Sequence, residues 1–352
     1  MQRRVAPVRG RAALPVARLL SVLGMISLVS TAGCSSGRNT GSGSTAAHLL
    51  GSNQTIHLEY LQKQGDQQYF VDEAAGAKAE AAKLGNVEVT IVDIGSDANK
   101  AISEMDTAVA QKVDGIAIVV PDQQIGPAVI DRARAAGIPL IASDDVIKDE
   151  TGQEAAFVGF DGTLMGQKIG EEAGKLYTAA GWTAANTRII AAWKQDLSVC
   201  RDRVDGARQA FTAATGQNLQ TIEIGTNNTP TDAEDKAGAA LTANPGVKHW
   251  VVWGCNDENE TGVVTALQND GVAARDIIGV GIGAYLDCKD WKAGQVTGNK
   301  AALYIDGNDV GASAIDSLVA TIRQGVPLPP KTIARSTIVD ATSWRAAGVA
   351  CT

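Results

Sequence analysis

The sequence predicts an α/β protein of two similar lobes, each built on an open parallel sheet, joined by a hinge. Apolar runs of strand length alternate with helical segments twice along the chain, from about residue 55 and again from about residue 188. A late helix, a proline cluster and a last strand do not fit the second series, so the chain is expected to cross between the lobes. The 352 residues are enough for two cores.

The first 54 residues are not expected to belong to either lobe. Five Arg followed by the apolar stretch from Leu19 to Val29 are typical of a signal peptide, which we assign to residues 1–33. The apolar stretch is too short for a stable membrane span. Small residues run directly into Cys34, as in a bacterial lipobox, although Thr31 departs from the usual Leu. Cys34 is therefore expected to carry a lipid, with ordinary cleavage as the alternative. Residues 34–54 are predicted to be the anchor and a flexible tether, rich in Gly, Ser and Thr.

Charge and cysteine content exclude several classes of function. Removal of residues 1–33 leaves 26 basic and 39 acidic residues, a net charge of −13, which argues against nucleic acid or an anionic membrane surface as partner. Three His, two of them in predicted strands, favour neither a zinc site nor a Ser-His-Asp triad, and no metal or cofactor is expected. The remaining cysteines allow two disulfides with three possible pairings: Cys200, Cys255, Cys288 and Cys351.

The first lobe is assigned to residues 55–163 and 304–331. Its strands are predicted at 56–61, 87–92, 116–120 and 138–142, with a further strand at 155–160. Helices are predicted at about 70–84, 98–112, 124–136 and 309–323, where Asp97 is a good N-cap and Gly85, Gly115 and Gly137 mark helix ends.

The second lobe is assigned to residues 164–303 and 332–352. Its strands are predicted at 188–193, 221–225, 248–253 and 277–282, with a last strand from Thr332 to Val339, and a further strand at 301–305 lies across the boundary between the two assigned lobes. Helices are predicted at about 164–178, 200–215, 231–243 and 259–270. Two such lobes are expected to close on a small ligand at their strand ends.

The most informative strand end is Asp144-Asp145, after the apolar run Ile138–Ala142. Ligands of open α/β sheets bind at the carboxyl ends of strands, and a carboxylate accepts hydrogen bonds from ligand hydroxyls. The alternative is a helix cap followed by a solvated Asp. After the first strand come Lys63, a donor, and the adjacent aromatics Tyr69 and Phe70, of which one is expected in the helix core. An aromatic face with charged neighbours suits a sugar ring.

The second lobe offers complementary groups. Arg201 and Arg203 cannot share one helix face, so one is expected to aim at the cleft and the other to be an exposed helix charge. Asn256 follows the strand at 248–253 and either binds hydroxyls or caps the next helix. The glycines at 279–283 lack the spacing of a nucleotide loop.

These segments together resemble the periplasmic sugar-binding proteins of ABC importers, of the pentose/hexose type. The resemblance covers about residues 55–345 and is strongest to the L-arabinose-binding branch of the family. The segments that carry it are residues 63–70, 141–145, 197–206, 247–257 and 276–282. It implies the type I periplasmic-binding-protein fold with three hinge crossings, a monomer, and a permease as partner. It implies these ligand-binding residues: Lys63, Gln67, Tyr69, Phe70, Asp144, Asp145, Leu164, Arg203, Cys255, Asn256 and Gly283.

Several of these positions depart from the family pattern. Tyr69 replaces the ring-stacking Trp, Gln67 replaces a Glu, Cys255 a Met, and Gly283 a second Asn that bonds the sugar. Buried polar mismatches of this kind cost on the order of 1–3 kcal/mol each, so D-galactose, a related aldose or a furanose form is as open as L-arabinose.

The resulting prediction is an extracytoplasmic, lipid-anchored solute-binding protein without enzymatic activity that passes a monosaccharide to an ABC permease. Three alternative functions make different demands on the sequence. A repressor of the same core fold would need a DNA-binding N-terminus, where a signal peptide stands. A glycosidase would need two carboxylates flanking a scissile bond, which neighbouring Asp residues do not supply. A sensor that presents sugar to a membrane kinase or chemoreceptor stays open.

Overall fold

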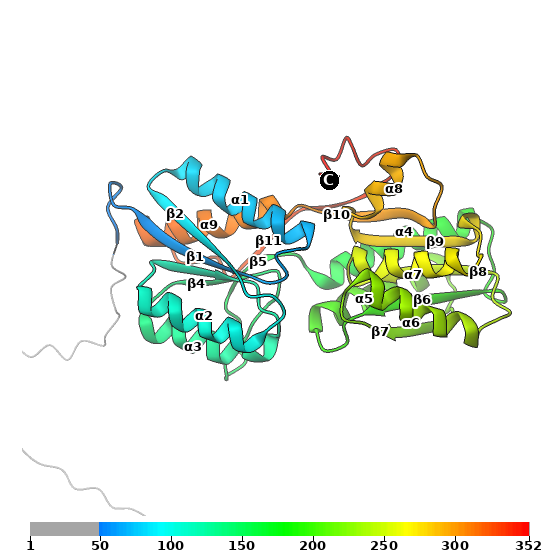
Figure 1. Cartoon of the computed structure of the whole chain (residues 1–352), viewed down its shortest axis with the longest axis horizontal. Coiled ribbons are helices and arrows are strands. Elements are labelled where there is room, and N and C mark those ends of the chain that lie inside the picture. Colours follow the sequence, from blue (N-terminus) through cyan, green and yellow to red (C-terminus); the bar gives the residue numbers. More distant parts are fainter. Residues whose placement is uncertain (1–48, 352) are drawn as a thin grey trace, which may run out of the picture. The chain divides into compact units, whose positions relative to one another are not determined.

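The computed structural model describes residues 49–351, which fold as two α/β lobes with a six-stranded sheet in each (Figure 1). The predicted fold class is therefore confirmed. The signal peptide, Cys34 and tether residues 34–48 lie outside the described residues. Tether residues 50–54 form a turn on the first lobe, where Leu50 N–H donates to Ile322 O at 3.2 Å and Gln54 N–H to Gly51 O at 2.9 Å.

The first sheet has the order β11-β5-β4-β3-β1-β2, and all of its pairings are parallel. Figure 1 shows α1 and α9 on one face and α2 and α3 on the other. The strands are β1 (Ile56–Gln62), β2 (Val87–Asp93), β3 (Gly115–Ile118), β4 (Leu140–Ser143), β5 (Ala156–Gly159) and β11 (Lys331–Ile333). The helices are α1 (Gln68–Leu84), α2 (Ala98–Gln111), the short η1 (Gln123–Ile125), α3 (Gly126–Ala136) and α9 (Gly307–Gln324).

The second sheet repeats this order as β12-β10-β9-β8-β6-β7, except that its edge strand β12 is antiparallel to β10. Its strands are β6 (Thr187–Trp193), β7 (Thr221–Gly225), β8 (His249–Gly254), β9 (Ile277–Gly283), β10 (Asn299–Ile305) and β12 (Ser336–Asp340). Its helices are α4 (Gly162–Ala179), α5 (Ser198–Thr215), α6 (Pro230–Ala243), α7 (Asp257–Asn269), the short η2 (Ala274–Asp276) and α8 (Asp287–Ala293). In both lobes the first strand lies inside the sheet, so its carboxyl end adjoins a topological switch point where ligands bind.

The chain passes between the two sheets three times: from β5 to α4, from β10 to α9, and from β11 to β12. The predicted single strand from Thr332 to Val339 is wrong. It is two strands in different sheets, because the segment passes from one lobe to the other at Ala334-Arg335 in extended conformation. The helix α8 was not predicted, since its seven residues are too few for a helical pattern to stand out.

Glycines allow close contact between the helix after a crossing and its neighbour in that lobe. A Cβ at Gly166 or Gly170 of α4 would collide with the carbonyl oxygen of Arg203 or Ala207 in α5. A Cβ at Gly76 of α1 would collide with Asn308, near the start of α9. The helix pairs α4–α5 and α1–α9 therefore pack backbone against backbone, next to two of the three crossings.

Both disulfides permitted by the cysteine count are present in the second lobe. Cys200 pairs with Cys255, and Cys288 pairs with Cys351 near the C-terminus. Within residues 49–351, no helix combines the length and the apolar character needed to cross a membrane.

Candidate functional site

A cavity, partly open to solvent, lies at the strand ends of both sheets. Nine of the eleven candidate residues from the sequence line it: Lys63, Gln67, Tyr69, Phe70, Asp144, Asp145, Arg203, Cys255 and Asn256. The fold thus brings together side chains that are up to 193 positions apart in the chain.

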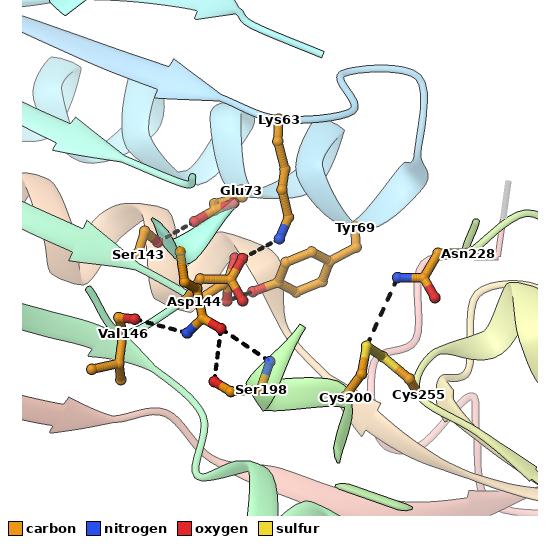
Figure 2. Close-up of polar contacts among 12 residues, drawn as sticks. Lys63, Tyr69, Glu73, Ser143, Asp144, Val146, Ser198, Cys200, Asn228 and Cys255 are labelled. Carbon is orange, nitrogen blue, oxygen red and sulfur yellow. Dashed lines mark hydrogen bonds and ion pairs between the residues drawn. A yellow bond between two sulfur atoms is a disulfide. The ribbon is translucent and has the colours of Figure 1, made fainter. Parts of the chain in front are cut away.

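The two aspartates after β4 have different partners. Asp145 forms an ion pair with Lys63, and both side chains are nearly buried (Figure 2). Asp144 accepts a hydrogen bond from the Tyr69 hydroxyl at 2.7 Å. The backbone of Asp144 is left-handed, with a φ of 58°, a conformation that Asp tolerates better than most residues. This turn sends the two neighbouring carboxylates to separate partners.

A buried polar cluster supports Asp144 from behind. The Tyr60 hydroxyl meets Glu73 Oε1 at 2.5 Å and Ser143 Oγ at 2.9 Å, and Ser143 also bonds Glu73. Burial and the charge of Asp144 raise the pKa of Glu73 well above its ordinary value. Burial likewise raises the pKa of Asp144 to about 6, while the Tyr69 hydroxyl and the cations Lys63 and Arg203 oppose that rise. The charge state of Asp144 therefore depends on its neighbours near neutral pH.

Both aromatic residues of the first lobe belong to the first turns of α1 and are more than nine-tenths buried. The Tyr69 and Phe70 rings meet edge to face with centroids 5.2 Å apart. Both line the cavity and both pack in the core, so the expectation that only one of them joins the core is wrong. Tyr69 combines a cavity wall with a hydrogen bond to Asp144, which a Trp at this place could not form in the same way.

In the second lobe, Arg203 reaches the cavity from α5 and donates to the carbonyl oxygen of Cys255 at 2.7 Å. Arg201 is exposed, as expected for the second arginine of this helix. The disulfide between Cys200 and Cys255 forms part of the cavity wall and joins the start of α5 to the loop that follows β8. The disulfide and the Arg203 bond thus connect the same two segments.

Asn256 has both roles that the sequence left open. Its side-chain oxygen caps α7 by accepting from the backbone N–H of Asn259 at 3.1 Å, and it also accepts from the Asn259 side chain at 2.5 Å. Asn256 lines the cavity as well. Because its oxygen is committed to the cap, the amide Nδ2 is the group that remains to donate to a ligand.

Asn228 and Tyr285 are among the cavity residues that sequence reasoning missed. Asn228 lies after β7 in a left-handed conformation, and its side chain bonds Asn259 and lies 3.9 Å from the Cys200 sulfur. The Tyr285 hydroxyl bonds both carboxylate oxygens of Glu258 at 3.0 and 2.9 Å. Burial is the main cause that raises the pKa of Glu258 to about 8. A polar residue just after a strand was the signal that singled out Asn256, and Asn228 and Tyr285 likewise follow closely on β7 and β9.

Two candidates do not line the cavity. Leu164 is 45% exposed and lines a separate hollow with Lys168 and residues 333–337. A Cβ at Gly283 would collide with the Tyr285 ring, so an Asn does not fit there without displacing this ring. Tyr285 thus occupies the space next to Gly283. Among residues 49–351, no group of three or more His, Cys, Asp or Glu is arranged to hold a metal ion.

The fold and the cavity together define a two-lobed solute-binding protein. The family model of the periplasmic binding protein domain matches residues 59–325, and the chain belongs to this family. It is 28% identical to the ABC transporter L-arabinose-binding periplasmic protein of Azospirillum brasilense over 299 residues, 83% of this chain and 88% of that protein. It is also 28% identical to the L-arabinose-binding periplasmic protein of Escherichia coli over 282 residues, 79% of this chain and 85% of that protein.

Solved structures share the fold at lower identity. The myo-inositol binding protein of Caulobacter, crystallised with myo-inositol, superposes with a TM-score of 0.73 at 20% identity, over 85% of this chain and 98% of that chain.

Proposed function

We propose that this chain is an extracytoplasmic solute-binding lipoprotein that captures a monosaccharide between its lobes and delivers it to an ABC permease. L-arabinose, D-galactose and related aldoses are the proposed ligands. Support comes from the family, whose members act outside the cytoplasm, and from the relatives named for L-arabinose binding. The cavity chemistry is the second and independent line of support.

The charge balance of the cavity is the single observation that carries this proposal. Two carboxylates, Asp144 and Asp145, face two cations, Lys63 and Arg203, so the lining favours a neutral ligand over an ion. Carboxylates accept hydrogen bonds from hydroxyls, whereas Lys, Arg and the Asn256 amide donate to hydroxyl or ring oxygens. The Tyr69 and Phe70 rings add an apolar wall. A neutral ring with hydroxyls on its edge and C–H groups on its face satisfies all of these groups.

The choice among sugars depends on the positions that depart from the family pattern. Gln67 is a neutral amide whose Nε2 lies 3.5 Å from Asn228 O in the opposite lobe. Gly283 offers no side chain, and the ring of Tyr285, which lines the cavity, occupies the space that a side chain at Gly283 would need. These changes alter the hydrogen-bond groups on one side of the ring, and so the hydroxyl stereochemistry that is preferred.

Calorimetric titration tests the ligand class. The chain from residue 35 is titrated with aldopentoses, aldohexoses and myo-inositol, with glutamate, an anionic amino acid, as the charged control. Micromolar or tighter binding of one aldose, lost in Asp145→Ala, is the expected result. Binding of the amino acid, or of no monosaccharide, contradicts the proposal.

The anchor and the partner need separate tests. Lipidation at Cys34 predicts a membrane-bound mature protein with a diacylglyceryl mass increment on its N-terminal cysteine, and release to the soluble fraction in Cys34→Ser. Delivery to a permease predicts that deletion of the chain abolishes uptake of the bound sugar. Normal uptake with loss of a sugar response instead favours the sensor role.

A further inference from the structure

A single amide side chain connects the two lobes beside the cavity without lining it. Gln123 lies in the first lobe, at the start of η1 after β3. Its Nε2 donates to Val146 O at 2.8 Å, directly after the aspartate pair. Its Oε1 accepts from the second lobe, from the backbone N–H of Ser198 at 3.1 Å and from the Ser198 hydroxyl at 2.7 Å (Figure 2).

The contact on the second lobe is at the first turn of α5. The first four amides of a helix have no partner within the helix, and a side chain at the N-cap usually supplies one. The N-cap of α5 is Leu197, whose side chain has no polar atom and makes no such bond. Gln123 provides the missing acceptor from the opposite lobe. The cap therefore exists only while the lobes are together.

The position of this contact relates it to ligand binding. Helix α5 carries Arg203 and Cys200 into the cavity, whereas the segment bonded by Nε2 follows Asp144 and Asp145. A second hydrogen bond between the lobes joins two cavity residues, from Gln67 Nε2 to Asn228 O, and is long at 3.5 Å. Gln123 thus fixes the spacing of two half-sites that are expected to hold one ligand.

We propose that Gln123 is a positioning residue that stabilises the ligand-bound arrangement of the lobes by capping α5 from the opposite lobe. This inference rests on the proposed function, because it needs a ligand between the lobes. It requires a carboxamide, with a donor toward Val146 and an acceptor toward Ser198. A carboxylate has no donor for the Val146 carbonyl, so glutamate cannot replace glutamine here.

The expected effect of Gln123→Ala is on dissociation of the ligand. Lobe closure follows encounter, so loss of the cap raises koff and leaves kon nearly unchanged. Loss of net hydrogen bonds of ordinary strength predicts about tenfold weaker affinity. Gln123→Glu is expected to weaken binding as well, although its charge at a helix N-terminus compensates in part. Gln124→Ala is the matched control, since Gln124 is the exposed neighbour in the same turn.

Stopped-flow binding of the sugar found in the calorimetric panel gives kon and koff for wild type and variants, with thermal unfolding as a check on folding. Gln123→Ala and Ser198→Ala are also combined, and the double variant is expected to bind no worse than Gln123→Ala alone, because the Ser198 hydroxyl acts through Gln123. An unchanged koff in Gln123→Ala, or fully additive losses, overturns the inference.

Amide hydrogen exchange separates this inference from the proposed function, since it needs no sugar. The Ser198 amide is expected to exchange faster in Gln123→Ala than in wild type and Gln124→Ala, because the variant lacks the acceptor that protects this amide. If wild type binds no sugar and the Ser198 amide exchanges faster in Gln123→Ala, the proposed ligand class is refuted, but the capping of α5 by Gln123 is supported. Normal sugar binding with unchanged exchange and unchanged koff refutes the cap alone.

Discussion

Removal of the Tyr69 hydroxyl is expected to move the protonation of Asp144 into the neutral range. This hydroxyl donates to Asp144 Oδ1 at 2.7 Å, while Asp144 Oδ2 is buried without a hydrogen-bond partner among the described residues. The hydrogen bond favours the ionised form of Asp144, whose pKa burial has already raised to about 6. Tyr69→Phe deletes that bond and leaves the ring, so it changes the electrostatics with little change in shape.

The size of the shift follows from the strength of a hydrogen bond to a charged group. A bond of about 1.5–3 kcal/mol, at about 1.4 kcal/mol per pKa unit, raises the pKa of Asp144 by about 1–2 units, to about 7–8. At pH 7 the wild-type carboxyl is then about nine-tenths ionised and the variant between about one-half and one-tenth. If sugar hydroxyls donate to the ionised carboxylate, affinity at pH 7 falls about twofold to tenfold and recovers near pH 9.

Carboxyl ¹³C NMR of the free protein reports the pKa of Asp144, and calorimetry between pH 5.5 and 9 reports affinity. Tyr177→Phe is the matched control, because the buried Tyr177 hydroxyl has no hydrogen-bond partner among the described residues. The reasoning fails if the pKa of Asp144 is unchanged or lower in Tyr69→Phe. It also fails if the affinity lost at pH 7 stays lost at pH 9.

Three further predictions concern the ion pair, the disulfides and Glu258. Asp145→Ala leaves the nearly buried Lys63 unpaired, so the free energy of unfolding measured with denaturant should fall by about 3 kcal/mol. Calorimetric titration of this variant should show no sugar binding, and an unchanged free energy of unfolding would argue against a desolvated ion pair. Serine replacement of Cys200–Cys255 or of Cys288–Cys351 should lower Tm comparably, since the sequence separations are 55 and 63 residues, but only the first should weaken sugar binding. The Glu258 carboxyl keeps its proton to about pH 8 when folded, whereas in the unfolded chain it ionises near pH 4.5, so unfolding free energy should fall as pH rises from about 5 to 8. Glu258→Gln should flatten that slope; an unchanged slope would assign it to other groups.

The sequence was sufficient for the two sheets and for most of the cavity wall because these follow from local pattern. Buried strands end at recognisable polar residues, and parallel strands place those ends along one edge. Helix geometry predicted that only one of Arg201 and Arg203 faces the cavity, the family resemblance selected Arg203, and the structure places Arg203 in the cavity wall with Arg201 exposed. The prediction of a single strand at Thr332–Val339 was wrong for a physical reason. A strand segment that passes from one sheet to another shows the same alternation of apolar and polar residues as a strand that stays in one sheet.

Features that depend on distance through space were not predictable. Which cysteines pair, and that the Tyr69 hydroxyl meets Asp144, depend on how loops approach one another after folding. Gln123 is a plain polar residue in a loop, and nothing in its neighbours indicates a partner 75 positions away. Leu164 was carried over from the family alone, and it lies in a different hollow.

The glycine contacts between helices have a mechanical consequence. Helices α4 and α9 each begin directly after a crossing, and they touch α5 and α1 with no side chain between the backbones. Those partners present Arg203 and Tyr69 to the cavity, from the second turn of α5 and the first turn of α1. Each helix pair is therefore expected to move as one rigid unit, which carries a ligand contact and adjoins a crossing between the lobes. A small displacement at the ligand end is expected to rotate a whole lobe, because no compressible layer absorbs it.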